Sequence, residues 1–122
     1  LFNASTSGKS ADGEWTAYNA SKHAVLQFMK CLAVEVGEQD IRVNAICPGW
    51  AESKMATAVI EKTAQQNGED FEDAYERTMR GNMLGVLIGP ESLADMALFL
   101  AGRHGRYITG QAINVCGGVN YY

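Results

Sequence analysis

A tyrosine and a lysine stand four positions apart in the segment AYNASKHAV, residues 17–25. On a helix, positions 18 and 22 share one face, with Cβ atoms about 5–6 Å apart. At that separation an ammonium stabilises a phenolate by about 3 kcal/mol if the effective dielectric constant is about 20. An ordinary tyrosine is a poor proton acceptor at neutral pH. The pair Tyr18 and Lys22 therefore predicts a general acid or base, the alternative being a chance pair on a solvated helix surface.

Two neighbouring features favour the chemical interpretation. With Thr16 as the expected N-cap, Tyr18 lies in the first helical turn, where the positive end of the helix dipole favours a phenolate. Ser5 precedes Tyr18 by thirteen residues and ends an apolar run. Because open α/β sheets place their sites at the carboxyl ends of strands, the Ser5 hydroxyl is expected to bind the same substrate oxygen. Thr6 and Ser7 compete with Ser5 for this role.

The elements that must position these side chains follow from hydrophobic periodicity and turn residues. The sequence predicts strands at 1–5, 41–47 and 112–118, a helix over 16–36 closed by Gly37, two short helices over 53–80 that break near Asn67-Gly68, and a helix from Pro90 to about Leu100. This order favours right-handed crossovers and a parallel sheet with helices on its faces.

The helix over 16–36 is apolar on most of its circumference. One row holds Ala17, Ala20, Ala24, Phe28, Cys31 or Leu32, and Val36, and the opposite side adds Val25, Leu26 and Met29. Such a helix is normally buried on two sides. We expect it to pack against its own sheet and against a second subunit.

The composition excludes several classes of partner. The 122 residues are 47% hydrophobic with a net charge of -4, which is typical of one globular domain without a basic stripe for nucleic acid or an anionic membrane. Three cysteines without paired spacing, and His23 and His104 without partners, predict no metal site and a reducing, cytoplasmic location. No apolar run reaches the roughly 20 residues that span a bilayer.

Four segments resemble successive blocks of the short-chain dehydrogenase/reductase family: FNAS, AYNASKHAV, IRVNAICPGW and ITGQAINVCGG. They occur in the family's order and at suitable separations. The resemblance implies a doubly wound, Rossmann-like parallel sheet, of which residues 1–122 would form the C-terminal half. It also implies a homodimer or homotetramer.

The resemblance implies an NAD- or NADP-dependent oxidoreductase that interconverts a secondary alcohol and a ketone. Ser5, Tyr18 and Lys22 would be catalytic, and Tyr18 and Lys22 would also contact the cofactor. Pro48 and Gly49 match a segment whose backbone faces the nicotinamide. A plain strand-ending turn is the alternative for these two residues.

Several further residues carry implied roles. Trp50 belongs to the same cofactor segment, and Ser53 stands where the family usually has a cofactor-binding threonine. Trp15 and Trp50 are candidates for the substrate pocket, with core packing as the alternative. Residues 53–88 would cover the substrate. Cys116 stands where an aspartate is common, which affects only a structural contact.

The family's glycine-rich loop, its catalytic asparagine and the residue that selects NAD or NADP would all lie upstream of Leu1. The sequence therefore does not indicate which cofactor is used. Two other functions fit the same residues: an epimerase or dehydratase of an allied family that uses Tyr18 and Lys22, and a catalytically silent binding or scaffold protein.

Overall fold

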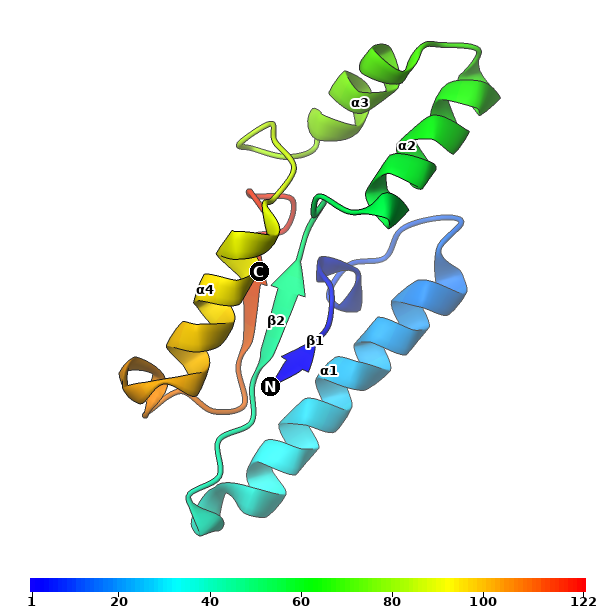
Figure 1. Cartoon of the computed structure of the whole chain (residues 1–122). Helices are drawn as coiled ribbons and strands as arrows, with labels where there is room; N and C mark the ends of the chain where they lie inside the picture. Colours follow the sequence, from blue (N-terminus) through cyan, green and yellow to red (C-terminus); the bar gives the residue numbers. More distant parts are fainter.

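The computed structural model describes residues 1–122 as a three-stranded parallel sheet with four α-helices around it (Figure 1). The strands are β1 (Phe2–Asn3), β2 (Ala45–Pro48) and β3 (Ala112–Val115), in the spatial order β1-β2-β3. The helices are α1 (Thr16–Val36), α2 (Lys54–Asn67), α3 (Phe71–Met79) and α4 (Pro90–Ala101). The register pairs Ala45 with Phe2 on one side and with Ala112 on the other.

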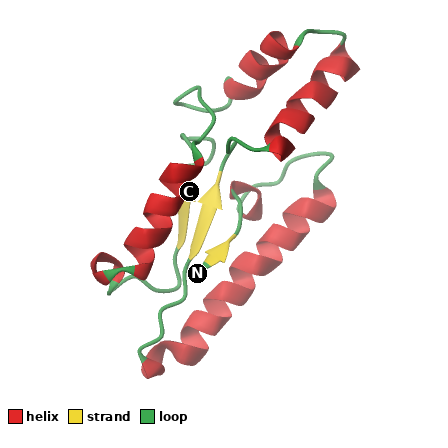
Figure 2. Ribbon diagram, viewed as in Figure 1, coloured by secondary structure: helices red, strands yellow, loops and turns green.

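Helices cover both faces of the sheet (Figure 2). The largest core cluster joins Leu26, Met29 and Ala33 of α1 to Ala45 and Cys47 of β2. Alternate residues of a strand point to opposite faces, and α4 lies on the other face, against β2 and β3 (Figure 1). The predicted parallel α/β arrangement with helices on both faces is therefore confirmed.

Helix α1 has the predicted bounds and the predicted C-cap, Gly37, but its N-cap differs from the prediction. The N-cap is Trp15, without a side-chain hydrogen bond, so Thr16 is already the first helical residue. Gly37 keeps a right-handed conformation because the chain continues into a 3-10 turn over Gly37–Gln39. The left-handed residue that ends this turn is Asp40, with φ 59°.

The row of α1 that faces the sheet is narrower than the apolar pattern of the sequence. Leu26, Met29 and Ala33 are buried. By contrast, most of the predicted apolar row from Ala17 to Val36 remains exposed, namely Ala17, Ala20, Ala24, Phe28 and Cys31. The second side of α1 is therefore available for another contact.

Helices α2 and α3 form a hairpin beyond the carboxyl ends of the strands (Figure 1). Gly68 ends α2 with φ 65°, at the break that the sequence predicts, and Asp70 caps α3 by accepting a hydrogen bond from Asp73 N. Ile60 and Ala64 of α2 pack with Ala74 of α3 in a second small core. The hairpin therefore has its own packing, next to the edge where sites of such sheets lie.

The strands are shorter than predicted, because residues 41–44 lead into β2 without joining the sheet ladder. Backbone and side-chain hydrogen bonds together hold this segment. The Asn44 carbonyl accepts from Phe2 N and the Val43 carbonyl accepts from Gly110 N. The Asn44 side chain donates to the carbonyl of Ile108, and Thr109 Oγ1 accepts from Val43 N. The Arg42 guanidinium donates to the carbonyls of Leu100 and Ala101 at the end of α4 and of Gly105 in the 3-10 turn that follows it. None of the helices is long and apolar enough to cross a membrane.

Candidate active site

Tyr18 and Lys22 lie one turn apart at the start of α1, and both are half-buried. The Lys22 Nζ is 5.5 Å from the centroid of the Tyr18 ring. The same ammonium donates a hydrogen bond of 3.4 Å to the carbonyl of Asn3, the last residue of β1. Lys22 therefore links the Tyr18 turn of the helix to the carboxyl end of the first strand and keeps two of its three donors free.

Ser5 follows β1 and is 7% exposed. Its Oγ accepts a hydrogen bond of 3.1 Å from Ser7 N and so caps the 3-10 turn over Thr6–Gly8. The Ser5 hydroxyl proton has no acceptor within the chain, whereas the Thr6 hydroxyl donates to the Pro48 carbonyl at 3.3 Å. Of these two buried hydroxyl groups, Ser5 is the one that can still donate to a substrate oxygen.

Gly8 brings the segment after Ser5 directly onto α1. A Cβ at this position would lie 2.8 Å from the Lys22 carbonyl oxygen and 2.9 Å from Leu26 Cδ1. Both distances are shorter than a carbon side chain tolerates, so only glycine allows this approach. The close packing places the 3-10 turn over Thr6–Gly8, which follows β1, against the helical turn that carries Lys22.

Trp15 packs against Tyr18 rather than in the core. The two ring centroids are 6.0 Å apart in an edge-to-face arrangement, and Trp15 is 42% exposed. Trp50 is half-buried, and its carbonyl accepts a hydrogen bond from Ile88 N. The two tryptophans therefore lie in different surroundings: Trp15 is beside Tyr18, and Trp50 is beside the segment that precedes α4.

The Pro48-Gly49 turn has a packing reason of its own. A Cβ on Gly49 would lie 2.9 Å from the backbone and from the Cβ of Cys116, so the glycine is needed where β2 and β3 end. Ser53 is the N-cap of α2: its Oγ accepts from Ala56 N and donates to the Ala51 carbonyl. Both residues thus have structural tasks that require no cofactor.

A buried thiol lies beneath this edge. Burial raises the pKa of the Cys47 thiol, while the positive charge of Lys9 and a backbone hydrogen bond from Ser5 act in the opposite direction. Cys47 is completely buried. We therefore assign it to the core and give it no part in proton transfer.

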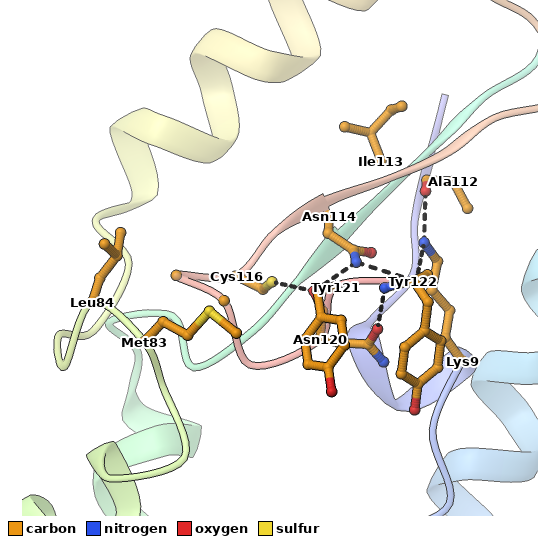
Figure 3. A pocket seen from close by; sticks show the side chains of 12 residues that line it. Lys9, Met83, Leu84, Ala112, Ile113, Asn114, Cys116, Asn120, Tyr121 and Tyr122 are labelled. Carbon is orange, nitrogen blue, oxygen red and sulfur yellow. Dashed lines mark hydrogen bonds between the residues drawn. The ribbon is translucent and has the colours of Figure 1, made fainter.

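A separate open pocket lies beside β3 (Figure 3). It contains none of the predicted catalytic or cofactor-binding residues, but Met83 and Leu84, from the segment predicted to cover the substrate, line it. Lys9 donates there to the carbonyls of Ala112 and Tyr122, and the Asn114 amide donates to those of Asn120 and Tyr122. The Cys116 thiol donates to the Asn120 carbonyl at 3.2 Å. Cys116 therefore makes a structural contact with the segment that follows β3.

Two contacts that shape this edge were not predicted from the sequence. The Thr6 hydroxyl joins the ends of β1 and β2 through Pro48, and the amide of the buried Asn19 reaches the carbonyl of Asp12. Neither contact has a sequence signal, since both partners are backbone carbonyls. No group of three or more histidine, cysteine, aspartate or glutamate side chains is placed to hold a metal ion.

Comparisons with known proteins agree with this geometry. Residues 1–120 match the family model described as enoyl-(acyl carrier protein) reductase. A putative ketoacyl reductase of Streptomyces coelicolor is 38% identical over 119 residues, which are 98% of this chain and 46% of that protein. The D-beta-hydroxybutyrate dehydrogenase of Cupriavidus necator is 34% identical over 116 residues, 94% of this chain and 45% of that protein.

Solved structures are similar over the same extent. The F189W actinorhodin polyketide ketoreductase with NADPH superposes with a TM-score of 0.92 and 38% identity, over 98% of this chain and 46% of that one. A 4-hydroxyisoleucine dehydrogenase mutant complexed with NADH and succinate gives 0.81 and 30%, over 97% and 45%. The chain spans about half the length of the relatives it matches. It belongs to the short-chain dehydrogenase/reductase family, which the four sequence blocks predicted.

Proposed function

We propose that this chain supplies the proton-transfer residues of an NAD- or NADP-dependent oxidoreductase that interconverts a secondary alcohol and a ketone. The observation that carries the proposal is the position of the Lys22 ammonium, 5.5 Å from the Tyr18 ring and bonded to the end of β1. The family membership and the cofactors named for related structures support it.

In the reducing direction, Tyr18 Oη donates its proton to the substrate oxygen as that oxygen becomes negative. The Ser5 hydroxyl, whose proton is free, donates a hydrogen bond to the same oxygen and stabilises the developing charge. The phenolate left on Tyr18 is stabilised by the Lys22 ammonium and then takes a proton from water. Oxidation of the alcohol follows the reverse path, with Tyr18 as the base.

The residues present fit a nicotinamide cofactor in part. Lys22 has two free ammonium donors for a ribose hydroxyl, and the backbone of Pro48, Gly49 and Trp50 ends β2 at the same edge of the sheet. Ser53 fits less well, because its hydroxyl already donates to the Ala51 carbonyl. A bound nicotinamide would supply or accept the hydride at the substrate carbon.

Residues 53–88, with the α2–α3 hairpin, are proposed to cover the substrate, and Trp15 and Trp50 to line its pocket. The hairpin packs on its own small core and stands at the carboxyl ends of the strands (Figure 1). Segments of this kind can move on binding. Several relatives are named as putative ketoacyl reductases, so acyl ketones are the first substrates to examine.

The proposal is tested with the full-length protein and a reduced nicotinamide cofactor carrying deuterium at its transferable position. The substrates would be acyl thioester ketones, keto acids, ketoses and steroid ketones. We expect one class to give an alcohol with deuterium at the carbinol carbon. An epimerase or dehydratase would consume no net cofactor, and a silent scaffold would transform none of the classes. Either result would overturn the proposal.

A further inference from the structure

Asn19, the residue after Tyr18 in α1, is buried in an unusual way. It is only 7% exposed, and its Oδ1 is shielded from solvent without receiving a hydrogen bond. A buried acceptor without a partner is unfavourable for folding, and native structures hold few of them. This side chain therefore calls for an explanation other than stability.

The two nitrogen atoms of Asn19 hold both ends of the turn formed by residues 12–15. The backbone N donates to the Trp15 carbonyl at 2.8 Å, which is an ordinary helical bond at the start of α1. The side-chain Nδ2 donates to the Asp12 carbonyl at 3.5 Å. Asp12 is tied to the preceding loop as well, because its carboxylate accepts a hydrogen bond of 3.1 Å from the Ser10 hydroxyl.

The turn between these two attachments is strained. Glu14 has φ 67°, which is a left-handed conformation that residues other than glycine rarely adopt. Such conformations persist where the surrounding contacts leave the chain no other path. The helix bond at Trp15 and the side-chain bond at Asp12 fix the residues on either side of Glu14, and only the bond at Asp12 requires the asparagine amide.

The turn ends at Trp15, whose ring packs edge-to-face on that of Tyr18. Trp15 is the N-cap of α1 but makes no capping hydrogen bond with its side chain. Its position thus depends on the turn that precedes it. Asn19, which follows Tyr18 in the sequence, holds that turn through its hydrogen bond to Asp12.

We propose that Asn19 is a positioning residue, which holds the turn over residues 12–15 so that Trp15 fixes the ring of Tyr18 in its reactive orientation. The inference rests on the proposed role of Tyr18 in proton transfer. Small errors in the placement of a reacting group reduce the turnover number strongly. When the amide of Asn19 is lost, Trp15 leaves the Tyr18 ring, which then samples unreactive orientations.

The test is a double-mutant cycle in the full-length protein, with Asn19→Ala, Trp15→Ala and the pair together. We expect Asn19→Ala to lower kcat by about ten- to a hundred-fold, with the KM for the cofactor unchanged. Because Asn19 acts through Trp15, the double variant should be no slower than the slower single variant. Additive losses would overturn the proposal.

A second readout does not depend on activity. In protein labelled with fluorotryptophan, the resonance of Trp15 is assigned by Trp15→Phe and followed by fluorine NMR. We expect Asn19→Ala to shift and broaden this resonance and to leave that of Trp50 in place. An unchanged Trp15 resonance would overturn the proposal even if kcat falls. Asn19→Leu, which keeps about the size but removes the donor to Asp12 without adding a charge, replaces the alanine variant if that variant does not fold.

Asn44 provides a matched control. It is 3% exposed, and its amide also donates to a backbone carbonyl, that of Ile108, but at the opposite end of β2. Asn44→Ala should lower the melting temperature without changing kcat per folded molecule. If Tyr18→Phe turned over normally, the proposed function itself would fail. If Tyr18→Phe were inactive while Asn19→Ala kept its kcat and Trp15 signal, only the present inference would fail.

Discussion

At the scale of single residues, the site depends on which hydroxyl groups remain free. Ser5 and Thr6 are adjacent and similarly buried, yet only the Thr6 hydroxyl donates a hydrogen bond within the chain, to the Pro48 carbonyl. The two residues therefore take different tasks. We propose that Ser5 binds the substrate oxygen, whereas Thr6 links the segment after β1 to the end of β2.

This division predicts different effects for two substitutions in the full-length protein. Thr6→Val keeps the side-chain shape and leaves the Pro48 carbonyl without its donor, so it should lower the free energy of unfolding by about 1–3 kcal/mol. Ser5→Ala should lower kcat about a hundred-fold or more, because a donor to the developing oxyanion is lost. Urea unfolding and steady-state kinetics measure the two effects. A larger loss of kcat in Thr6→Val than in Ser5→Ala would reverse the assignment.

The buried thiol of Cys47 predicts a pH effect on stability. Its pKa is raised in the folded protein, so the unfolded chain loses this proton first, from about pH 8.5 upward. Its contribution is complete below that pH and falls as the pH rises towards the folded pKa. Cys47→Ala should therefore show a smaller loss of unfolding free energy between about pH 8 and 10. Parallel curves for the two proteins would contradict this.

At the scale of elements, substitutions at Ser53, the N-cap of α2, distinguish a capping role from a role in cofactor binding. Ser53 caps α2 through Ala56 N. Ser53→Ala should reduce stability by about 0.5–2 kcal/mol, while Ser53→Asp, an equally good cap, should restore it. If the hydroxyl also holds the cofactor, Ser53→Asp should restore stability but still weaken cofactor binding in a fluorescence titration. Equal cofactor affinity for all three proteins would limit Ser53 to capping.

The end of α4 depends on Arg42, whose guanidinium reaches three carbonyls that lie 58 to 63 residues further along the chain. A lysine ammonium is a point donor without the planar fork that spans several acceptors. Arg42→Lys should therefore lower the free energy of unfolding by about 1.5–3 kcal/mol. Thermal unfolding checks this, and a melting temperature equal to that of the wild type would show that the bonds contribute little.

Several elements could be predicted from the sequence because their signals are local. The bounds of α1 follow from its apolar period, and the break between α2 and α3 follows from Asn67-Gly68, where Gly68 adopts a left-handed conformation. The sheet-facing row of α1 could not be predicted, because that helix is apolar on most of its circumference. The contacts of Arg42 and Asn19 could not be predicted either, since their partners are backbone carbonyls, which carry no residue identity.

At the scale of the whole molecule, the exposed side of α1 suggests contact with a second copy. Phe28 is 60% exposed and Val34 is 83% exposed, and at 3.6 residues per turn they lie on the two flanks of the buried row of α1. Large apolar side chains exposed in this way often mark interfaces. The chain spans about half the length of its relatives. The alternative is therefore that another part of the same full-length protein packs on the exposed residues of α1.

Phe28→Glu and Val34→Glu distinguish packing against a second copy from packing within one chain. If a second copy covers α1, the double variant should remain folded, by circular dichroism, and should shift to a smaller assembly in light scattering. Leu98→Glu on α4, where Leu98 is 71% exposed, is the comparison on the other face of the sheet. A variant that unfolds without first dissociating would show that the α1 face is covered within one chain.

The central claim is that Tyr18 transfers the proton. It is tested most directly by comparing Tyr18→Phe with wild type in the full-length protein, measuring turnover by nicotinamide absorbance and cofactor affinity by fluorescence titration. The substitution removes only the hydroxyl, so kcat should fall by about a thousand-fold or more while the Kd of the cofactor stays nearly unchanged. Turnover equal to that of the wild type would contradict the account.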